Sequence, residues 1–170
     1  MMIALTGTPG TGKTSIASAL QNRGHAVFHA SDTVKPYLLG ADPDRDTDII
    51  DDERWALEFT PVKGVIEGHL AHLLPAERII ILRCRPDILK IRLTERGYSK
   101  EKVQENIEAE LLDAILIEAV EIHGPEKIYE IDTTDRDITC CTDRIEEVIR
   151  GTAVPAVGTV DWLAACGDLL

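Results

Sequence analysis

Residues 7–14 read Gly-Thr-Pro-Gly-Thr-Gly-Lys-Thr. This octapeptide matches the phosphate-loop pattern G-x-x-x-x-G-K-[ST] at every fixed position, namely Gly7, Gly12, Lys13 and Thr14. An apolar run at 3–5 precedes it, and apolar residues at helical spacing follow over 15–20. A strand, a glycine loop and a helix in direct succession turn backbone N–H groups and a helix N-terminus toward phosphate. The stretch therefore predicts a nucleoside triphosphate site.

The last residues of the octapeptide have separate expected tasks. In loops of this kind the lysine, here Lys13, reaches the β- and γ-phosphates, and the hydroxyl of Thr14 is a ligand of Mg²⁺. A glycine-rich turn before a helix can also arise by chance, but four matched positions in the right context favour the functional interpretation. We therefore expect Mg²⁺ as the cofactor, bound together with the nucleotide.

The composition limits the kinds of partner. The chain has 170 residues, of which 30 are acidic and 18 basic, with a formal net charge of −12. Its length fits a single domain with a buried core. Because nucleic-acid binding depends on neutralising phosphates, so acidic a surface is not expected to bind RNA or DNA strongly by itself. A basic protein is the electrostatically favoured kind of partner.

Membrane and secreted classes are also disfavoured by the sequence. It contains no run of about twenty apolar residues, and residues 1–3 lead straight into the first expected strand, which leaves no room for a signal peptide. The four cysteines show neither the spacing of a metal site nor a disulfide framework. They are Cys84, Cys140, Cys141 and Cys166. These features predict a protein of the reducing cytoplasm, without a membrane partner.

Alternating strand and helix patterns predict the rest of the fold. Short apolar runs predict further strands at 26–28, 64–68, 78–83 and 127–131. Helical spacing predicts helices at 86–96, 100–120 and 138–149, and a segment at 55–62 that Pro61 interrupts. Strands that alternate with helices after a phosphate loop predict an α/β fold of the P-loop NTPase class. We expect a parallel five-stranded sheet covered by helices on both faces, with the ligand beyond the carboxyl ends of the strands.

Three segments are expected to depart from this core. Residues 33–54 are rich in aspartate, proline and glycine, which predicts a mobile, solvated insertion at about 30–54. Gly97 lies between two expected helices and predicts a short closing lid at about 95–105. The core then spans 1–150, and the tail at 151–170 is expected to pack Trp162 against it.

Glu67 and His69 follow the third expected strand, at the edge of the sheet where ligands bind. An acid at this place commonly helps to hold Mg²⁺, directly or through water, and a histidine beside it can orient a water molecule or a phosphate oxygen. The alternative for Glu67 is an ordinary acid at a strand end. His69 and His72 are three residues apart but no third metal ligand follows, so His72 is interpreted as structural.

Arg92 and Arg96 are four residues apart on the helix before Gly97, so they share one helix face. Both are candidates to point at the phosphates, where guanidinium donors stabilise the charge that develops in phosphoryl transfer. The alternative is a solvated, charged helix that ends at a glycine. Arg96, which is next to the expected hinge, is the stronger of the two candidates.

Three motifs together resemble one known family. They are residues 7–14, the Glu67-Gly68-His69 element, and the run from Arg96-Gly97-Tyr98 to Val103 with Asn106 and Ile107 downstream. In this combination the chain is similar to the isoenzyme-six adenylate kinases, the archaeal and eukaryotic nuclear adenylate kinases and ATPases that assist maturation of the small ribosomal subunit. The similarity extends from residue 2 to about 150, and the Arg-Gly-Tyr element is its most discriminating part.

The resemblance implies roles for individual residues. The phosphates of ATP would be held by Gly10, Thr11, Gly12, Lys13, Thr14 and Ser15, with Arg96 as the lid arginine. Arg136 would border the adenine, and Asp32 and Lys35 would border AMP. Glu67 stands where family members carry aspartate, which moves the carboxylate outward. Lys35 stands where an arginine is expected, and a lysine lacks the bidentate fork, so AMP affinity would be weaker.

By the same resemblance, the expected activity is Mg²⁺-dependent transfer of the ATP γ-phosphate to AMP, giving two ADP, together with ATPase activity. The implied role is maturation of small-subunit rRNA (16S or 18S) with a basic small-subunit ribosomal protein of the uS-eleven type, in the archaeal cytoplasm or the eukaryotic nucleus. Two alternatives stay open, an ATPase assembly switch without a significant kinase role and a small-metabolite kinase. Lys35, Arg45 and Arg54 prevent the exclusion of small anionic acceptors.

Overall fold

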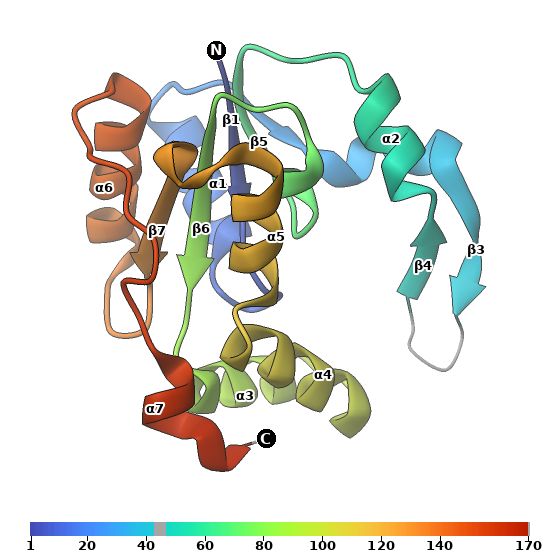
Figure 1. Ribbon diagram of the computed structural model, residues 1–170, viewed down its shortest axis with the longest axis vertical. Helices are drawn as coiled ribbons and strands as arrows, with labels where there is room; N and C mark the ends of the chain where they lie inside the picture. Colours follow the sequence, from blue (N-terminus) through green and yellow to red (C-terminus); the bar gives the residue numbers. More distant parts are fainter. Residues whose placement is uncertain (43–46, 170) are drawn as a thin grey trace.

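The computed structural model describes residues 1–42 and 47–169, which form a central sheet with helices around it (Figure 1). The strands of the sheet are β1 (Met2–Thr6), β2 (Val27–His29), β5 (Gly64–Glu67), β6 (Arg78–Arg83) and β7 (Ile128–Asp132). Their order is β2-β5-β1-β6-β7, and every pair of neighbours is parallel. The prediction of a parallel five-stranded sheet is therefore confirmed.

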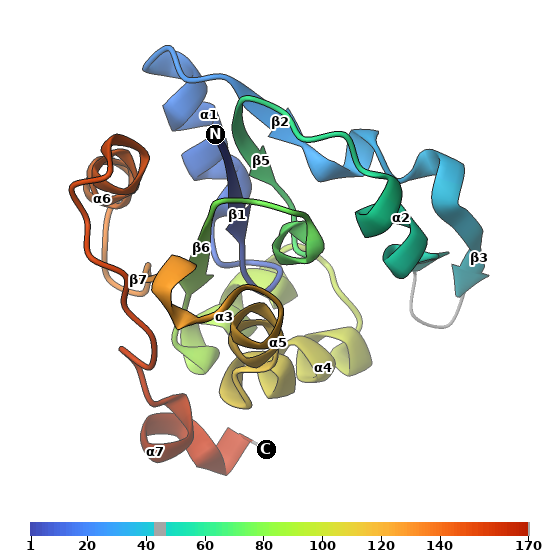
Figure 2. The same ribbon diagram turned by 45° about the horizontal axis from the view of Figure 1, so that its top comes forward.

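Helices cover both faces of this sheet (Figures 1 and 2). They are α1 (Lys13–Asn22), α2 (Asp52–Glu58), α3 (Pro86–Glu95), α4 (Lys100–Leu111), α5 (Ala114–His123), α6 (Ile138–Arg150) and α7 (Trp162–Cys166). Short 3-10 turns lie at Ala30–Asp32, Lys35–Tyr37, Ala71–Leu73, Pro125–Lys127 and Gly167–Leu169. In the part of the chain that the structure describes, no helix combines the length and apolar character needed to cross a bilayer.

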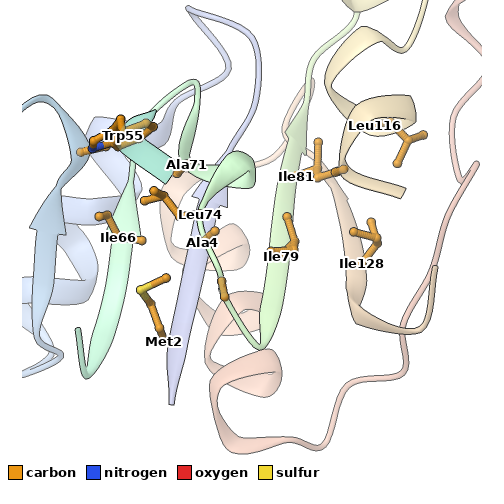
Figure 3. Close-up of a cluster of buried hydrophobic side chains, with 13 residues drawn as sticks. Met2, Ala4, Trp55, Ile66, Ala71, Leu74, Ile79, Ile81, Leu116 and Ile128 are labelled. Carbon is orange, nitrogen blue, oxygen red and sulfur yellow. The ribbon is translucent and has the colours of Figure 1, made fainter. Parts of the chain in front are cut away.

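The first face of the sheet carries a buried apolar cluster (Figure 3). Alternate strand residues point to this face, namely Met2, Ala4, Ile66, Ile79, Ile81 and Ile128. They pack against Trp55 of α2, Leu74, and Leu116 of α5. Trp55 is only 1% exposed, so the short helix α2 is held to the sheet by one large side chain.

The second face is covered by α1 and α6. The intervening strand residues point there, namely Ile3, Leu5, Val65, Ile80, Leu82 and Ile131. Ile16 and Leu20 of α1 and Ile145 and Val148 of α6 pack on them. Successive residues of β1 and β6 are thus buried on opposite faces, which explains their nearly continuous apolar sequence.

A third apolar cluster joins α3, α4 and α7 beyond the carboxyl end of β6. Leu89 and Leu93 of α3 meet Val103 and Ile107 of α4 there. The side chain of Trp162, which begins α7, is 8% exposed and lies in the same cluster. The tail also joins the sheet directly, because Ala156 forms a parallel bridge with Tyr129.

The expected continuous helix at 100–120 is wrong, because α4 ends at Leu111 and α5 begins at Ala114. Asp113 has a φ of 55°, in the left-handed region that non-glycine residues seldom adopt. The Asp113 carboxylate pairs with the guanidinium of Arg83, which gives a physical reason for the break at this residue. The apolar pattern continues across the break, so periodicity alone did not reveal it.

The acidic segment at residues 33–54 contains strands that the sequence did not predict. Strands β3 (Leu38–Asp42) and β4 (Thr47–Ile50) form a separate antiparallel pair beside α2 (Figure 1). Arg45 lies outside the described residues. The helix expected at 55–62 begins earlier, at Asp52, where the side chain of Asp51 accepts a hydrogen bond from the N–H of Arg54. It ends at Glu58, ahead of Pro61.

Candidate active site

The phosphate loop connects β1 to α1, as its sequence predicts. Gly7 has a φ of 139°, and a side chain added there would collide with the carbonyl oxygen of Leu82. Gly12 has a φ of 103° and precedes the first residue of α1. Since Gly12 has no side chain to cap the helix, the first N–H groups of α1 stay available to an anion.

Lys13 folds back across the loop. Its Nζ donates hydrogen bonds to the carbonyl oxygens of Gly7 at 2.6 Å and Thr8 at 3.1 Å. Burial lowers the pKa of Lys13 to about 8, against the opposing effect of the Glu67 and Glu110 carboxylates. The ammonium group therefore rests on two backbone carbonyls beside the first turn of α1, where phosphate oxygens can replace those carbonyls.

A cavity of about 440 Å³ opens on one side of the loop. Its lining includes eight of the residues that the sequence singled out, namely Gly10, Gly12, Lys13, Thr14, Ser15, Glu67, His69 and Arg96. Ala30, Ile50 and Trp55 supply an apolar part of the wall. The pairing of β1 with β5 places Leu5 beside Glu67, which is why the loop and Glu67 meet at one edge of the sheet.

A second cavity of about 200 Å³ also borders the loop. It shares Gly10, Gly12, Ser15 and Arg96 with the first cavity. Thr11, Arg92 and Arg136 also line it, so the structure brings these three predicted residues to the same place. Two cavities thus adjoin along the phosphate loop, and Arg96 reaches both.

Glu67 has a partner that the sequence did not indicate. Its Oε1 lies 2.7 Å from Nδ1 of His29, the last residue of β2. The register between β2 and β5 places His29 directly beside Glu67. The carboxylate is thereby oriented from the neighbouring strand, and the sequence carried no motif around His29 that pointed to this contact.

His69 is a neutral ring at physiological pH. Desolvation of the ring within the first cavity, together with the charges of Lys13, His72 and Lys102, lowers its pKa to about 4. A neutral imidazole can accept as well as donate a hydrogen bond, which suits it to hold a water molecule or a phosphate oxygen. His72, interpreted as structural, is 1% exposed and lies within hydrogen-bond distance of Thr6 Oγ1 at 3.1 Å.

The donor set fits Mg²⁺ bound together with a nucleotide. Among the described residues no three histidine, cysteine, aspartate or glutamate side chains gather into a metal cage. Mg²⁺ usually keeps several waters and takes one or two carboxylates plus substrate phosphates, so no such cage is required. The hydroxyl of Thr14 and the carboxylate of Glu67 line the same cavity and could complete that coordination.

Asp32 and Lys35 are exposed on the two 3-10 turns that follow β2. Their neighbours Ser31 and Val34 line the first cavity, whereas Asp32 and Lys35 are not part of its lining. Their role beside a second nucleotide stays a prediction. Trp55 Nε1 donates to Thr33 Oγ1 at 2.9 Å, which ties this segment to α2.

The sequence also did not predict a buried hydrogen bond behind the loop, between Thr8 and Glu110. Thr8 Oγ1 donates to Oε2 of Glu110 on α4 at 2.6 Å, and both residues are nearly inaccessible to solvent. The sequence did contain a sign of it, because Glu110 lies at helical spacing from Val103 and Ile107 on the apolar stripe of α4. A charged residue on such a stripe needs a buried partner.

Comparison with known proteins agrees with this geometry. A family model described as "AAA domain" matches residues 3–113. A protein of Natronomonas pharaonis named "Putative adenylate kinase" is 44% identical over 165 residues, covering 95% of this chain and 98% of that protein. Proteins of the same name from Archaeoglobus fulgidus and Methanocaldococcus jannaschii are each 42% identical, covering 99% and 100% of this chain and 95% and 97% of theirs.

Solved structures show the same fold at low sequence identity. A deoxyadenosine kinase from M. mycoides with bound dATP has a TM-score of 0.54 at 14% identity, over 88% of this chain and all of the other. An uncharacterized protein from Eubacterium ventriosum has a TM-score of 0.52 at 14% identity, over 88% and 98%. The predicted α/β fold of the P-loop NTPase class is confirmed. The chain belongs to the AAA-domain family and to the group of proteins named "Putative adenylate kinase".

Proposed function

We propose that the protein is an adenylate kinase that transfers the γ-phosphoryl group of ATP to AMP and releases two ADP. The observation that carries this proposal is the pair of cavities that adjoin along one phosphate loop and share Arg96. Two nucleotides bound in the two cavities would direct their phosphates toward the same group of cations. The names of the relatives support adenine nucleotides as the substrates.

The smaller cavity suits the donor. The N–H groups of residues 11–15 and the helix N-terminus would hold the ATP phosphates. Arg92 and Arg136 approach from α3 and from the segment after β7. Ile16, Ile138 and Cys141 form an apolar wall against which a base can lie. Thr133 joins this side of the site to the loop, because its Oγ1 lies 2.9 Å from the carbonyl oxygen of Thr11.

The larger cavity suits the acceptor. Among the apolar residues of its lining, Val34, Ile50 and Leu70 are only half-buried and offer a surface for the base of AMP. Asp32 and Lys35, on the adjacent turns, are proposed to border the acceptor and its phosphate. Lys35 contributes a point charge rather than a bidentate fork, so we expect modest AMP affinity.

Catalysis in this site is electrostatic. Phosphoryl transfer spreads charge over the equatorial oxygens, and cations placed around them stabilise the transition state. Lys13 and Arg96 line the first cavity from different elements and would meet those oxygens. Thr14 and Glu67 would hold Mg²⁺ together with the nucleotide, and the ion would supply further neutralisation of the phosphate charge. His29 holds Glu67 in position for that task.

We further propose that the same site hydrolyses ATP when no acceptor is bound. Neutral His69 lines the acceptor cavity and can hold a water molecule where the AMP phosphate would otherwise lie. The resemblance to the isoenzyme-six family and the net charge of −12 support a role in small-subunit assembly with a basic ribosomal protein of the uS-eleven type. The acidic surface also supports the expectation that RNA is not bound strongly by the protein alone.

An acceptor screen tests the proposed function. The purified protein is given ATP and Mg²⁺ with AMP, CMP, UMP or GMP, or without an acceptor, and ADP and free phosphate are measured separately. We expect ADP formation with AMP to exceed that with each other acceptor at least about tenfold. Lys13→Met should lower transfer by about 100-fold or more at an unchanged melting temperature, since Lys13 contacts the loop rather than the core.

The other outcomes of the screen favour the alternatives. Phosphate release that is indifferent to every acceptor would replace the kinase assignment with an ATPase switch. No ADP formation above background in any of the five reactions would leave the small-metabolite kinase as the remaining interpretation.

A further inference from the structure

A buried carboxylate lies directly behind the phosphate loop. Glu110 is 3% exposed near the carboxyl end of α4. Its Oε2 accepts the hydrogen bond of Thr8 Oγ1 at 2.6 Å. Its Oε1 accepts from Arg83 Nε at 2.9 Å, from the N–H of Cys84 at 3.1 Å and from Trp162 Nε1 at 3.1 Å. The phosphate loop, the end of β6 and the tail helix α7 therefore converge on one carboxylate.

Thr8 links Glu110 to Lys13 and Thr11, two of the residues proposed to bind phosphate. The carbonyl oxygen of Thr8 accepts from Lys13 Nζ at 3.1 Å and from Thr11 Oγ1 at 2.8 Å. The N–H of Thr11 also points to it, at 3.2 Å. Fixing the side chain of Thr8 thus fixes the carbonyl against which Lys13 rests and the turn that contains Thr11.

The tail closes the same cluster from a second direction. The N–H of Thr159 donates to Glu130 Oε2 at 2.8 Å, and Glu130 Oε1 accepts from Arg83 Nη1 at 2.6 Å. Arg83, which is 2% exposed, also pairs with Glu110 and Asp113. Residues 159–162 therefore contact both buried glutamates that flank Arg83 (Figure 1 shows α7 beside α3 and α4).

Packing alone does not account for this arrangement. A buried ionic cluster is seldom more stable than apolar side chains of the same volume, because each charge loses its hydration. The ionic cluster borders the buried apolar side chains of α3, α4 and α7. Buried ionic groups of this kind are candidates for fixing one geometry among several, and here the geometry is that of the loop.

We propose that Glu110 is a positioning residue for the phosphate loop, and that the tail helix α7 completes its setting through Trp162. This inference rests on the proposed function, since it assigns Glu110 and Trp162 to the geometry of the same site. Neither residue lines the cavities of about 440 and 200 Å³, so they act on the site from behind the loop, through the hydrogen bond to Thr8 and, for Glu110, through its charge near Lys13.

The test compares variants of the two hydrogen bonds with matched controls. Thr8→Val keeps the shape of the side chain and removes the hydroxyl, whereas Thr8→Ser keeps the hydroxyl. Trp162→Phe removes the indole N–H but keeps an aromatic ring in the cluster. Leu163→Ala changes an exposed side chain of the same helix, 47% accessible, and is the control for α7. Binding of tripolyphosphate is measured by calorimetry, and transfer to AMP by initial rates.

We expect tripolyphosphate affinity to fall at least about tenfold in Thr8→Val and about threefold or more in Trp162→Phe. Thr8→Ser and Leu163→Ala should stay within about twofold of the parent. In Thr8→Val the Michaelis constant for ATP should rise with the loss of affinity, while the constant for AMP stays near that of the parent. A role in stability alone would instead lower the active fraction without moving either constant.

Two results would overturn the inference. One is parental tripolyphosphate affinity in both Thr8→Val and Trp162→Phe. The other is an equal loss in Thr8→Val and Thr8→Ser, because the hydroxyl would then not be responsible. Should Thr8→Val not fold, Trp162→Phe against Leu163→Ala decides the matter alone. If the variants lose tripolyphosphate affinity as expected but the parent protein does not phosphorylate AMP, the kinase proposal is wrong and the positioning role stands.

Discussion

The amine of Lys13 makes the candidate site sensitive to alkaline pH. Its pKa is lowered to about 8, so the cation is present below that pH and is lost as the pH rises through it. Since kcat/KM reports the free enzyme, we expect kcat/KM for ATP to fall by about tenfold per pH unit above about pH 8. Bound phosphates favour the cation, so kcat at saturating ATP should hold to higher pH.

Initial rates between pH 6 and pH 10 measure the alkaline fall of kcat/KM for ATP. Lys13→Arg is the control, because the charge of arginine does not titrate in this range. The groups that act on Lys13 are Glu67 and Glu110, which raise its pKa, and Arg96, which lowers it. Glu110→Gln should therefore move the alkaline fall of kcat/KM to lower pH. A parental profile that stays flat to pH 9.5 would contradict the assignment of Lys13 as the titrating group.

His69 leads to a prediction for the acid side. With a pKa lowered to about 4, the ring is already neutral at pH 5.5 and should not titrate between pH 5.5 and pH 7.5. We expect His69→Gln to reduce hydrolysis of ATP by about tenfold and transfer to AMP by less than about threefold. The ratio of the ATP hydrolysis rate of His69→Gln to that of the parent should be constant between pH 5.5 and pH 7.5. A ratio that changes with an apparent pKa near 6.5 would show that the ring is protonated in the active protein.

Individual site residues were predictable where they belong to a local motif. Gly12, Lys13 and Thr14 follow from eight consecutive residues whose backbone geometry is shared by loops of this kind. Glu110 and His29 act across long sequence separations, of 102 residues to Thr8 and 38 residues to Glu67. Such contacts depend on which strands and helices become neighbours, and no local pattern encodes that.

Arg96, the proposed lid arginine, lies at the end of α3. Arg96 caps this helix, is exposed, and lines both cavities, so it can meet the transferring group while holding neither nucleotide tightly. We expect Arg96→Ala to lower kcat by about 100-fold and to change the dissociation constant of ATP by less than about threefold. Rapid-mix kinetics and calorimetry measure the two quantities. Lys90→Ala, an exposed change on the same helix, is the control, and equal losses in rate and binding would identify Arg96 as a ground-state contact.

At the break between α4 and α5, two contributions to the free energy of unfolding oppose each other, the backbone strain at Asp113 and its ion pair with Arg83. Asp113→Gly relieves the left-handed backbone at a φ of 55° but removes a partner of buried Arg83. The gain from the backbone is below about 1 kcal/mol. The loss of a partly exposed ion-pair partner should outweigh it, so we expect a net destabilisation of about 1–2 kcal/mol in urea unfolding. Asp113→Asn, which also tolerates this backbone, separates the charge from the conformation, and a more stable Asp113→Gly protein would contradict the account.

Elements were predictable where one periodicity continues without interruption. The apolar runs of β1 and β6 and the stripe of α6 are of this kind. The strands β3 and β4 were not predicted, because β3 is largely exposed and both lie in an acidic segment whose composition resembles that of a loop. The α4–α5 break was missed because it depends on the pairing of Asp113 with Arg83.

The charge of the whole chain leads to a prediction about partners. At a net charge of −12, a complex with a basic small-subunit ribosomal protein should weaken steeply with salt, because screening acts on exposed charges. Neutralising the acidic segment with D44N, D46N, D48N and D51N should weaken it further; Asp44 and Asp46 lie outside the described residues. Pull-down from cell extract at low and high salt measures this. Recovery of RNA without a basic protein, or indifference to the four changes, would remove the proposed partner.

The convergence of distant segments on Glu110 has a consequence for biosynthesis. Thr8 and Glu110 are 102 residues apart, and Glu110 and Trp162 are a further 52 apart. On the ribosome, residues 7–14 are therefore translated well before Glu110 and Trp162, the two residues that support the phosphate loop from behind. Domains fold as units once enough of the chain has emerged. We therefore expect a chain that ends before Trp162 to bind tripolyphosphate more weakly than a chain that includes it.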